Sequence, residues 1–411
     1  MALHPILSAL LRNKTGPLLV AIQVALSLAI LANALYIIEV RQAVAARPTG
    51  VAHEEQVFGL QVRQLVKGSH QEQIALQRRE TATLRAVAGV VSVATVTQSP
   101  LSRSGNYFSL FTAPGQTAPA AQTTHYVAAD SLVQTWGLKL VEGRDFTATD
   151  YIDIDTTVSF DTPAVVIISQ ALARQLFPGA ASVIGKSIYQ GSGADRNAMR
   201  IIGVVERLQT PAAQTSERGE FSLIAPARLT GGFGADYTLR AEAGQRDRVM
   251  KEAEAAIRAA SPTPLIVRSN TLQGHRQDRY RADYAMAWML VTVSVLLLLI
   301  TASGIVGMAS LWVTQRRKQI GVRRALGARR VDILRYFLAE NFMITSAGVV
   351  AGVLLGLGLN QLLVSQLELP RLPPVYLAGG AVLLWLLGVA AVYGPAWRAA
   401  SISPATATRS A

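Results

Sequence analysis

The chain has 411 residues, half of them hydrophobic, and its 39 Lys and Arg against 26 Asp and Glu give a formal net charge of +13. It contains no cysteine, which excludes disulfides and thiolate metal sites. Residues 41–284 hold 26 basic and 22 acidic residues, a net of +4, so +9 lies on the shorter, apolar remainder. This distribution indicates membrane topology and contact with anionic lipid, and it argues against nucleic-acid binding, for which no motif is present.

Four apolar runs are long enough to cross a bilayer, which takes roughly 20 residues of helix. They are residues 16–40, 285–313, 342–363 and 375–394. The first run contains Ala32-Asn33-Ala34, which mimics a cleavage site, so a removed signal peptide is the alternative interpretation. The run is longer than the roughly 7 to 15 apolar residues of a signal sequence, which favours a retained span.

Basic residues set the expected orientation. Arg12 and Lys14 precede the first run, and residues 314–341 between the second and third runs hold eight Lys or Arg against one Asp and one Glu. Because cytoplasmic loops carry the excess of Lys and Arg, we place residues 1–15, 314–341 and 395–411 in the cytoplasm. Residues 41–284 and the short loop 364–374 then lie outside.

The pattern of the outer segment, residues 41–270, predicts a two-lobed mixed α/β domain. β-rich runs at 89–94, 164–168 and 200–205 predict strands, and residues 247–260 predict an amphipathic helix. Another helix follows Ser169 and is closed by Pro178-Gly179. Residues 102–124 and 212–219, rich in small and polar residues, are expected to be surface loops, with a border between two lobes among them.

Residues 271–284 are mostly polar and lead directly into the second span, and Gly274 is the one helix-breaking residue among them. They predict a helical stalk that is continuous with that span. In the basic segment, Gln319–Leu326 predicts a short helix that breaks at Gly327. A further helix leads into the third span, and Asp332 is expected in its first turn, where the helix dipole favours an acid.

Small residues recur every four positions in the third span, at Gly348, Gly352 and Gly356. Such a ridge permits close helix approach, within one subunit or between two, although glycine is also common in membrane helices without a packing role. Polar side chains in the spans are expected to form hydrogen bonds between helices rather than to bind a ligand; they are Gln23, Asn33, Asn360 and Gln361.

Nothing in the sequence predicts catalysis, a metal or a cofactor on this chain. There is no P-loop motif G-x-x-x-x-G-K-[ST] and no G-x-S-x-G nucleophile motif. Each of the five histidines is interpreted as a surface residue, without metal-ligand spacing; they are His4, His53, His70, His125 and His275. An acidic cluster is interpreted as a solvated loop rather than a calcium site; it comprises Asp150, Asp153, Asp155 and Asp161.

Five blocks of sequence carry a resemblance to a known family. SGIVGMASLWVTQRRKQIGVRRALGARRVDILRYFLAEN and GPAWRAASISPATATR resemble the permease half of MacB-like ABC transporters, a group that includes FtsX-like and lipoprotein-exporting LolC/LolE-like permeases. In the outer segment, three blocks resemble successive parts of the MacB-type periplasmic core domain in the same order. These are HYVAADSLVQTWGLKLVEGRDF, AVVIISQALARQLFPGAASVIGKSI and RIIGVVERL.

The resemblance implies a four-span permease of the bacterial inner membrane that dimerises, as a homodimer or a heterodimer. It implies a separate cytosolic ABC ATPase that binds ATP and Mg²⁺, and it leaves open a periplasmic adaptor protein. The ATPase would drive movement of the periplasmic domains through the stalk and so export or extract a substrate. A non-transporting FtsX-like regulatory module and a LolC/LolE-like lipoprotein-releasing permease are the alternatives.

The short helix of the basic segment resembles the coupling helix on which the ATPase docks. Its residues are Gln319, Ile320, Gly321, Val322, Arg323, Arg324, Ala325, Leu326 and Gly327. Ile320, Val322 and Leu326 are the expected apolar anchors, with the two arginines as charge partners. The alternative is a polybasic turn against anionic lipid. Gln319 stands where the family usually has Glu, and Thr406 and Thr408 also differ from the residues usual in the family. Two explanations are open: the chain pairs with a second type of permease chain that keeps the full pattern, or the sequence has drifted.

Overall fold

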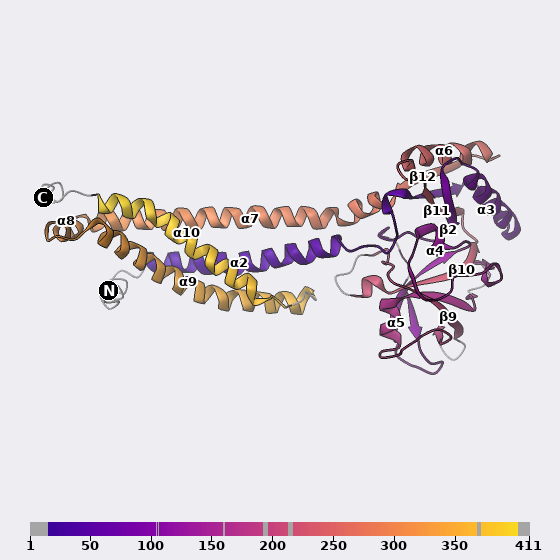
Figure 1. Ribbon diagram of the computed structural model, residues 1–411, viewed down its shortest axis with the longest axis horizontal. Coiled ribbons are helices and arrows are strands. Elements are labelled where there is room, and N and C mark those ends of the chain that lie inside the picture. The colour runs from indigo at the N-terminus through magenta and orange to yellow at the C-terminus, as the bar shows by residue number, and fades with distance from the viewer. Residues whose placement is uncertain are drawn as a thin grey trace. The chain divides into compact units, whose positions relative to one another are not determined.

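The computed structural model describes residues 15–103, 105, 107–158, 161–191, 196–212, 217–367 and 371–401. It divides into two compact units (Figure 1). One is a helical unit, made of the described residues up to Gln42 and from Asp283 onward. The other is an α/β unit, Ala43–Ala282. The four-helix membrane protein with a two-lobed α/β insertion that the sequence predicts is confirmed by these units.

The helical unit contains four long helices and one short one. They are α2 Thr15–Ala45, α7 Leu272–Gln315, α8 Arg317–Ala325, α9 Arg330–Leu367 and α10 Pro374–Ala400. Among the described residues, α2, α7, α9 and α10 are the helices long and apolar enough to cross a membrane. Each predicted span lies inside one of them, and the predicted stalk is the first part of α7, where Gly274 does not interrupt the helix.

Two helices run further than the apolar pattern indicated. α9 reaches Leu367, into the predicted loop 364–374, because no glycine or proline occurs between Gly358 and Pro370. α10 passes through Pro395 to Ala400, into the predicted cytoplasmic tail 395–411. Ala396, Ala399 and Ala400 are buried in the core of the helical unit, so packing rather than polarity sets this end.

The first sheet of the α/β unit has four antiparallel strands in the order β12-β1-β11-β2. Their bounds are β1 Val57–Gln64, β2 Val90–Thr95, β11 Gly234–Ala241 and β12 Leu265–Thr271. Helices α3 His70–Arg85 and α6 Arg246–Ala260 lie beside it (Figure 1). Phe58, Leu60 and Val62 alternate along β1 into one core, which Val249 and Ala253 of α6 enter at four-residue spacing.

The second sheet has eight strands along the path β4-β3-β8-β9-β7-β10-β6, with β5 paired to β9. Parallel pairing of β4 with β10 closes most of the path into a ring. The strands are β3 Tyr107–Phe111, β4 Ala121–Ala128, β5 Leu140–Gly143, β6 Ile152–Asp155, β7 Val165–Ser169, β8 Ser187–Gln190, β9 Asn197–Val205 and β10 Ser222–Thr230. The accompanying helices are α4 Leu132–Trp136, α5 Gln170–Leu176 and the 3₁₀ turns η1 Glu54–Gln56, η2 Ala148–Asp150 and η3 Glu217–Glu220.

The strands and helices predicted in this unit are confirmed, but one predicted loop is wrong. β9 contains the predicted strand 200–205, and β2 and β7 each begin and end one residue later than predicted. α6 covers the predicted amphipathic helix, and the Ser169 hydroxyl caps α5 by accepting from the Leu172 N–H. Residues 102–124 contain β3 and the start of β4, because Thr123 and Thr124 are buried and pair in a ladder despite their polarity. In the other predicted loop, residues 213–216 lie outside the described residues and η3 follows them.

Candidate functional site

The short helix α8 is the candidate site, and the chain enters and leaves it by tight connections. α7 ends at Gln315, and α8 starts two residues later, at Arg317. It ends before Gly327, whose φ of 96° lies in the left-handed region that favours glycine. α9 then begins at Arg330, with the Asp332 carboxylate accepting from the Arg329 N–H at 2.9 Å. The predicted short helix, its break at Gly327 and the place of Asp332 in the first turn of α9 are all confirmed.

One side of α8 is held against the helical unit. The guanidinium of Arg316, at the N-cap, donates to Glu340 of α9 over 2.8 Å, and the Glu340 side chain is only 1% exposed. One turn further on, Ile320 is 5% exposed in a cluster with Phe337 of α9 and Ala396 of α10. These contacts fix the helix from its start to its middle.

Burial of Ile320 corrects its expected role. The sequence placed Ile320 with Val322 and Leu326 as anchors for a partner, but Ile320 already packs within its own chain. Val322 is 53% exposed and Leu326 is 83% exposed. Helical periodicity explains the difference, because Val322 and Leu326 are four residues apart and share a face, whereas Ile320 points about 160° away from Val322.

The open side of α8 combines these two apolar residues with positive charge. Its exposed basic and amide side chains are Arg317, Lys318, Gln319 and Arg323. The Arg323 guanidinium also lies 5.2 Å from the centre of the Tyr336 ring on α9, and Arg324 donates to the Ala328 carbonyl. An apolar pair ringed by cations suits a partner that has an apolar pocket with an acidic edge.

The glycine ridge of α9 lies against the first helix. A methyl group added at Gly348 would meet the Ala21 carbonyl oxygen at 2.7 Å, and one at Gly352 would meet that of Ala25 at 2.9 Å. At Gly356 it would lie 3.0 Å from Leu377 of α10. The ridge therefore permits close packing within one chain, on α2 and α10.

Polar groups in the spans join the same helices. The Asn33 side chain of α2 donates to the Gly356 carbonyl at 3.1 Å, as the sequence predicted for an interhelical hydrogen bond. The Ser27 and Thr301 hydroxyls of α2 and α7 are 2.8 Å apart. Asn360 instead accepts from the Leu372 N–H in the following loop. Gln361 is exposed, and Gln23 lies where a side chain on Gly304 would be.

No group of three or more His, Cys, Asp or Glu residues gathers within metal-binding distance in the part of the chain that the structure describes. The acidic cluster divides into separate contacts. Asp150 pairs with Arg144 at 2.7 Å, and this hydrogen bond lowers the Asp150 pKa to about 2. Asp153 lies 3.3 Å from both Arg78 and Arg228.

Histidine 125 differs from its prediction as a surface residue. The side chain of His125, on β4, is 7% exposed, and its ring lies 4.4 Å from that of Phe108. Burial lowers the pKa of the imidazole to about 3. His4 lies outside the described residues.

Comparison with known proteins places the chain in a family. The model of the MacB-like periplasmic core domain matches residues 23–263, and that of the FtsX-like permease C-terminal domain matches residues 291–404, which include α8. A macrolide export ATP-binding/permease protein MacB of Agrobacterium fabrum is 28% identical over 65% of this chain and 40% of its own length. The ABC transporter permease YvrN of Bacillus subtilis is 26% identical over 69% of each chain.

The match to MacB spans less than half of that relative. Among solved structures, the periplasmic region of MacB from Actinobacillus actinomycetemcomitans covers 55% of this chain and 94% of its own, with 14% identity and a TM-score of 0.34. Two family models, in the order that the sequence indicated, together account for most of the chain. The chain belongs to the MacB-like, FtsX-type family of ABC transporter permeases.

Proposed function

We propose that this chain is the permease subunit of an ABC transporter of the bacterial inner membrane, with both termini and α8 in the cytoplasm and the α/β unit in the periplasm. A separate cytosolic ATPase docks on the open face of α8. Its opening and closing moves α7, which carries the motion to the α/β unit. Substrate is then exported or extracted at the periplasmic face.

The observation that carries this proposal is the continuity of α7. One helix of 44 residues runs from the end of β12 in the α/β unit to the residue before the Arg316 cap of α8. A helix of that length spans about 66 Å at 1.5 Å per residue, more than a bilayer. Because both of its ends join folded elements, this continuity supports the proposal that displacement of α8 is passed on to β12.

The proposed orientation follows from charge. Residues 314–341 carry the basic excess next to two spans, and this pattern is typical of a cytoplasmic loop. Movement of substrate at the periplasmic face, rather than through the bilayer, fits the spans, because residues 16–38, 285–313, 342–363 and 375–392 include no Asp, Glu, Lys, Arg or His. A charged or polar cargo path through the bilayer is usually lined by ionisable side chains.

ATP and Mg²⁺ are proposed to bind to the partner chain. The nearest approach to a P-loop here is Gly179 followed after five residues by Gly185-Lys186-Ser187, one residue longer than the motif. Ser187 begins strand β8, whereas a P-loop lysine precedes a helix whose N-terminus holds phosphate. The relative MacB, by its name, joins ATP-binding and permease parts in one protein, and we propose that two chains share those roles here.

We further propose that two permease chains assemble with two ATPases, and that a periplasmic adaptor contacts the α/β unit. A homodimer and a heterodimer both fit the sequence. A regulatory module of the FtsX type and a lipoprotein-releasing permease would use the same coupling at α8. They would differ in what the α/β unit contacts.

The test is ATPase retention by the full chain purified from its native membrane. Val322→Asp and Leu326→Asp place a carboxylate in an apolar contact and are expected to lower the copurified ABC ATPase at least tenfold. Val91→Asp is the matched control, because Val91 is 51% exposed and lies in the α/β unit. Wild-type levels of copurified ATPase in both α8 variants would contradict the docking role of this face. Its basic residues would then serve only to set the membrane topology.

A further inference from the structure

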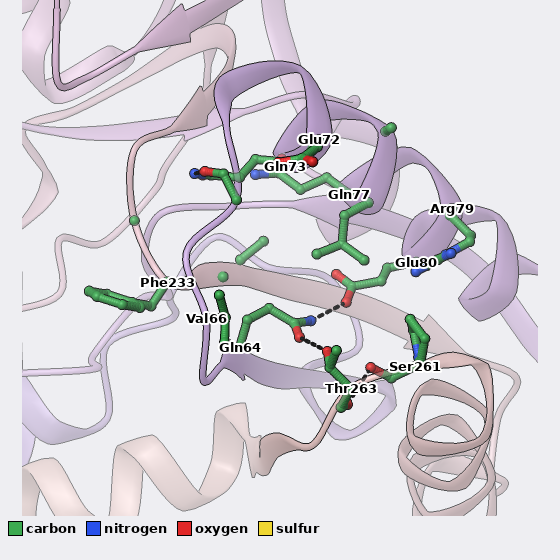
Figure 2. A pocket seen from close by; sticks show the side chains of 17 residues that line it. Gln64, Val66, Glu72, Gln73, Gln77, Arg79, Glu80, Phe233, Ser261 and Thr263 are labelled. Carbon is green, nitrogen blue, oxygen red and sulfur yellow. Dashed lines mark hydrogen bonds between the residues drawn. The ribbon is translucent and has the colours of Figure 1, made fainter.

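A cavity of about 630 Å³ lies in the α/β unit, and its lining residues all belong to that unit. It is bounded by α3, by the end of β1, by the turn between β10 and β11 and by the turn between α6 and β12 (Figure 2). These elements meet at the Gln64 and Leu265 end of the paired strands β1 and β12. Its volume lies within the range of about 300 to 1,000 Å³ that is usual for small-molecule sites.

Exposed apolar side chains form part of the mouth of the cavity, which the exposed Glu72 and Arg79 also line. Val66 is 74% exposed and Phe233 is 57% exposed, and both line it. Leu76, Ala235 and Pro262 add further apolar surface. Exposed large side chains of this kind next to a hollow mark a binding surface for an apolar group.

A buried carboxyl group lies at the base of the same cavity. Glu80 of α3 is 6% exposed and accepts hydrogen bonds from the Gln64 amide, at 3.1 Å, and from the Tyr237 hydroxyl. Figure 2 shows its carboxyl directed toward Gln64, on the inner side of α3. Burial is the main cause of the raised pKa of Glu80.

Glu80 forms no ion pair with any residue that the structure describes. Its exposed neighbour Arg79, the one basic residue that lines the cavity, forms no ion pair with it. The charge of Arg79 lowers the pKa of Glu80, but burial raises it by more. Two hydrogen bonds leave part of the acceptor capacity of the carboxylate unused. A buried carboxylate without an ion pair is costly, so a cation that enters the cavity and donates to Glu80 gains a charge-assisted hydrogen bond.

We propose that this cavity binds small amphipathic amines. The ammonium group donates to Glu80 at the base, and the apolar body lies against Val66 and Phe233 at the mouth. An acid at the base selects a cation over an anion, and the apolar side chains at the mouth exclude strongly hydrated cations such as Na⁺ and K⁺. This binding does not depend on α8 or on an ATPase.

The experiment uses the full chain in nanodiscs of phosphatidylcholine, without an ATPase. The fluorescent lipophilic cation rhodamine 6G is titrated by fluorescence polarisation, with empty nanodiscs subtracted and the neutral dye Nile red as the uncharged comparison. We expect saturable rhodamine 6G binding that Glu80→Gln weakens at least tenfold while changing Nile red binding less than twofold. Glu72→Gln is the matched control, because Glu72 lines the same cavity and glutamine can keep its capping contact with Ser69.

A second pair of variants avoids the core. Val66→Lys and Val66→Asp both remove the apolar side chain at an exposed position of the mouth and differ in the sign of the charge that they introduce. Val66→Lys is therefore expected to weaken rhodamine 6G binding more than Val66→Asp does. Thermal unfolding of each variant checks the fold. Absence of saturable binding, equal effects of Glu80→Gln and Glu72→Gln in folded protein, or indifference to charge at Val66 would each overturn the proposal. Because no ATPase is present, failure of the coupling proposal leaves this result standing.

Discussion

Arg316 Nη1 lies 2.8 Å from Glu340 Oε2, and this ion pair joins the start of α8 to α9. The two partners differ in environment, because the Glu340 side chain is 1% exposed and the Arg316 side chain is 22% exposed. Loss of the arginine leaves a buried carboxylate without a cation. Loss of the acid leaves a guanidinium that still reaches solvent. The two deletions are therefore not equivalent.

Arg316→Ala is expected to lower the free energy of unfolding by about 3 kcal/mol, and Glu340→Gln by about 1 kcal/mol, because only the first strands a buried charge. Denaturant titration of the detergent-solubilised chain measures both. Arg317→Ala is the control, since Arg317 is exposed, and its effect is expected within about 0.5 kcal/mol. Equal losses for the two partners would contradict the asymmetry.

Substitutions at Ile320 and Leu326 are expected to affect different properties, stability at Ile320 and ATPase binding at Leu326. Ile320→Ala removes a side chain that is 5% exposed and is expected to cost about 2 to 4 kcal/mol of stability. Leu326→Ala trims a side chain that is 83% exposed, so its cost is about 0.5 kcal/mol or less, yet ATPase retention falls. Unfolding midpoints and copurified ATPase are measured on the same preparations. A stable Ile320→Ala chain that loses only the ATPase would restore Ile320 as a docking residue.

The glycine ridge gives a paired test of packing. Gly352→Ala places a methyl group 2.9 Å from the Ala25 carbonyl oxygen and is expected to destabilise the helical unit by about 1 to 3 kcal/mol. Gly358 lies on the same helix with no atom within 4 Å of an added methyl group. Gly358→Ala is therefore expected to be neutral or stabilising by up to about 1 kcal/mol. Similar losses at both positions would show that helix approach is not limiting at Gly352.

His125 predicts acid sensitivity of the α/β unit. Its folded pKa of about 3 is below the usual value of about 6.5, so the unfolded chain binds the extra proton between these values. Stability contributed by the neutral imidazole is therefore complete above pH 6.5 and is lost progressively as the pH falls toward 3. From pH 7.5 to 5.0 the loss is about 2 kcal/mol. His125→Asn is expected to flatten the dependence of the unfolding midpoint on pH in this interval, and an unchanged slope would exclude His125 as its source.

Local signals in the sequence were sufficient for the elements. Long uncharged runs predicted the four membrane helices. Gly327 predicted the end of α8, and Ser169 as an N-cap predicted the start of α5. Each depends on a few neighbouring residues and on the period of the element. Thr123 and Thr124 show where this approach fails, because β4 pairs with the distant strand β10 as well as with its neighbour β3.

The candidate site was only half predictable for the same reason. The helix and its basic face follow from residues 314–341, but which side faces inward depends on α9 and α10. Ile320 and Val322 are equally apolar in the sequence, and only packing against Phe337 and Ala396 distinguishes them. The sequence holds only a weak indication that Glu340 is buried and paired, because it is a single acid at the edge of a long uncharged run. The acid at the base of the cavity, Glu80, had none, because α3 is polar along most of its length.

The short connections of α8 restrict its conformations within the helical unit. One residue, Arg316, separates α8 from α7, and four residues separate it from α9. A segment that is already ordered has little conformational entropy to lose when a partner binds it. A partner that binds the exposed face of α8 would therefore meet a preorganised surface, and lengthening either connection would be expected to weaken binding without removing a contact.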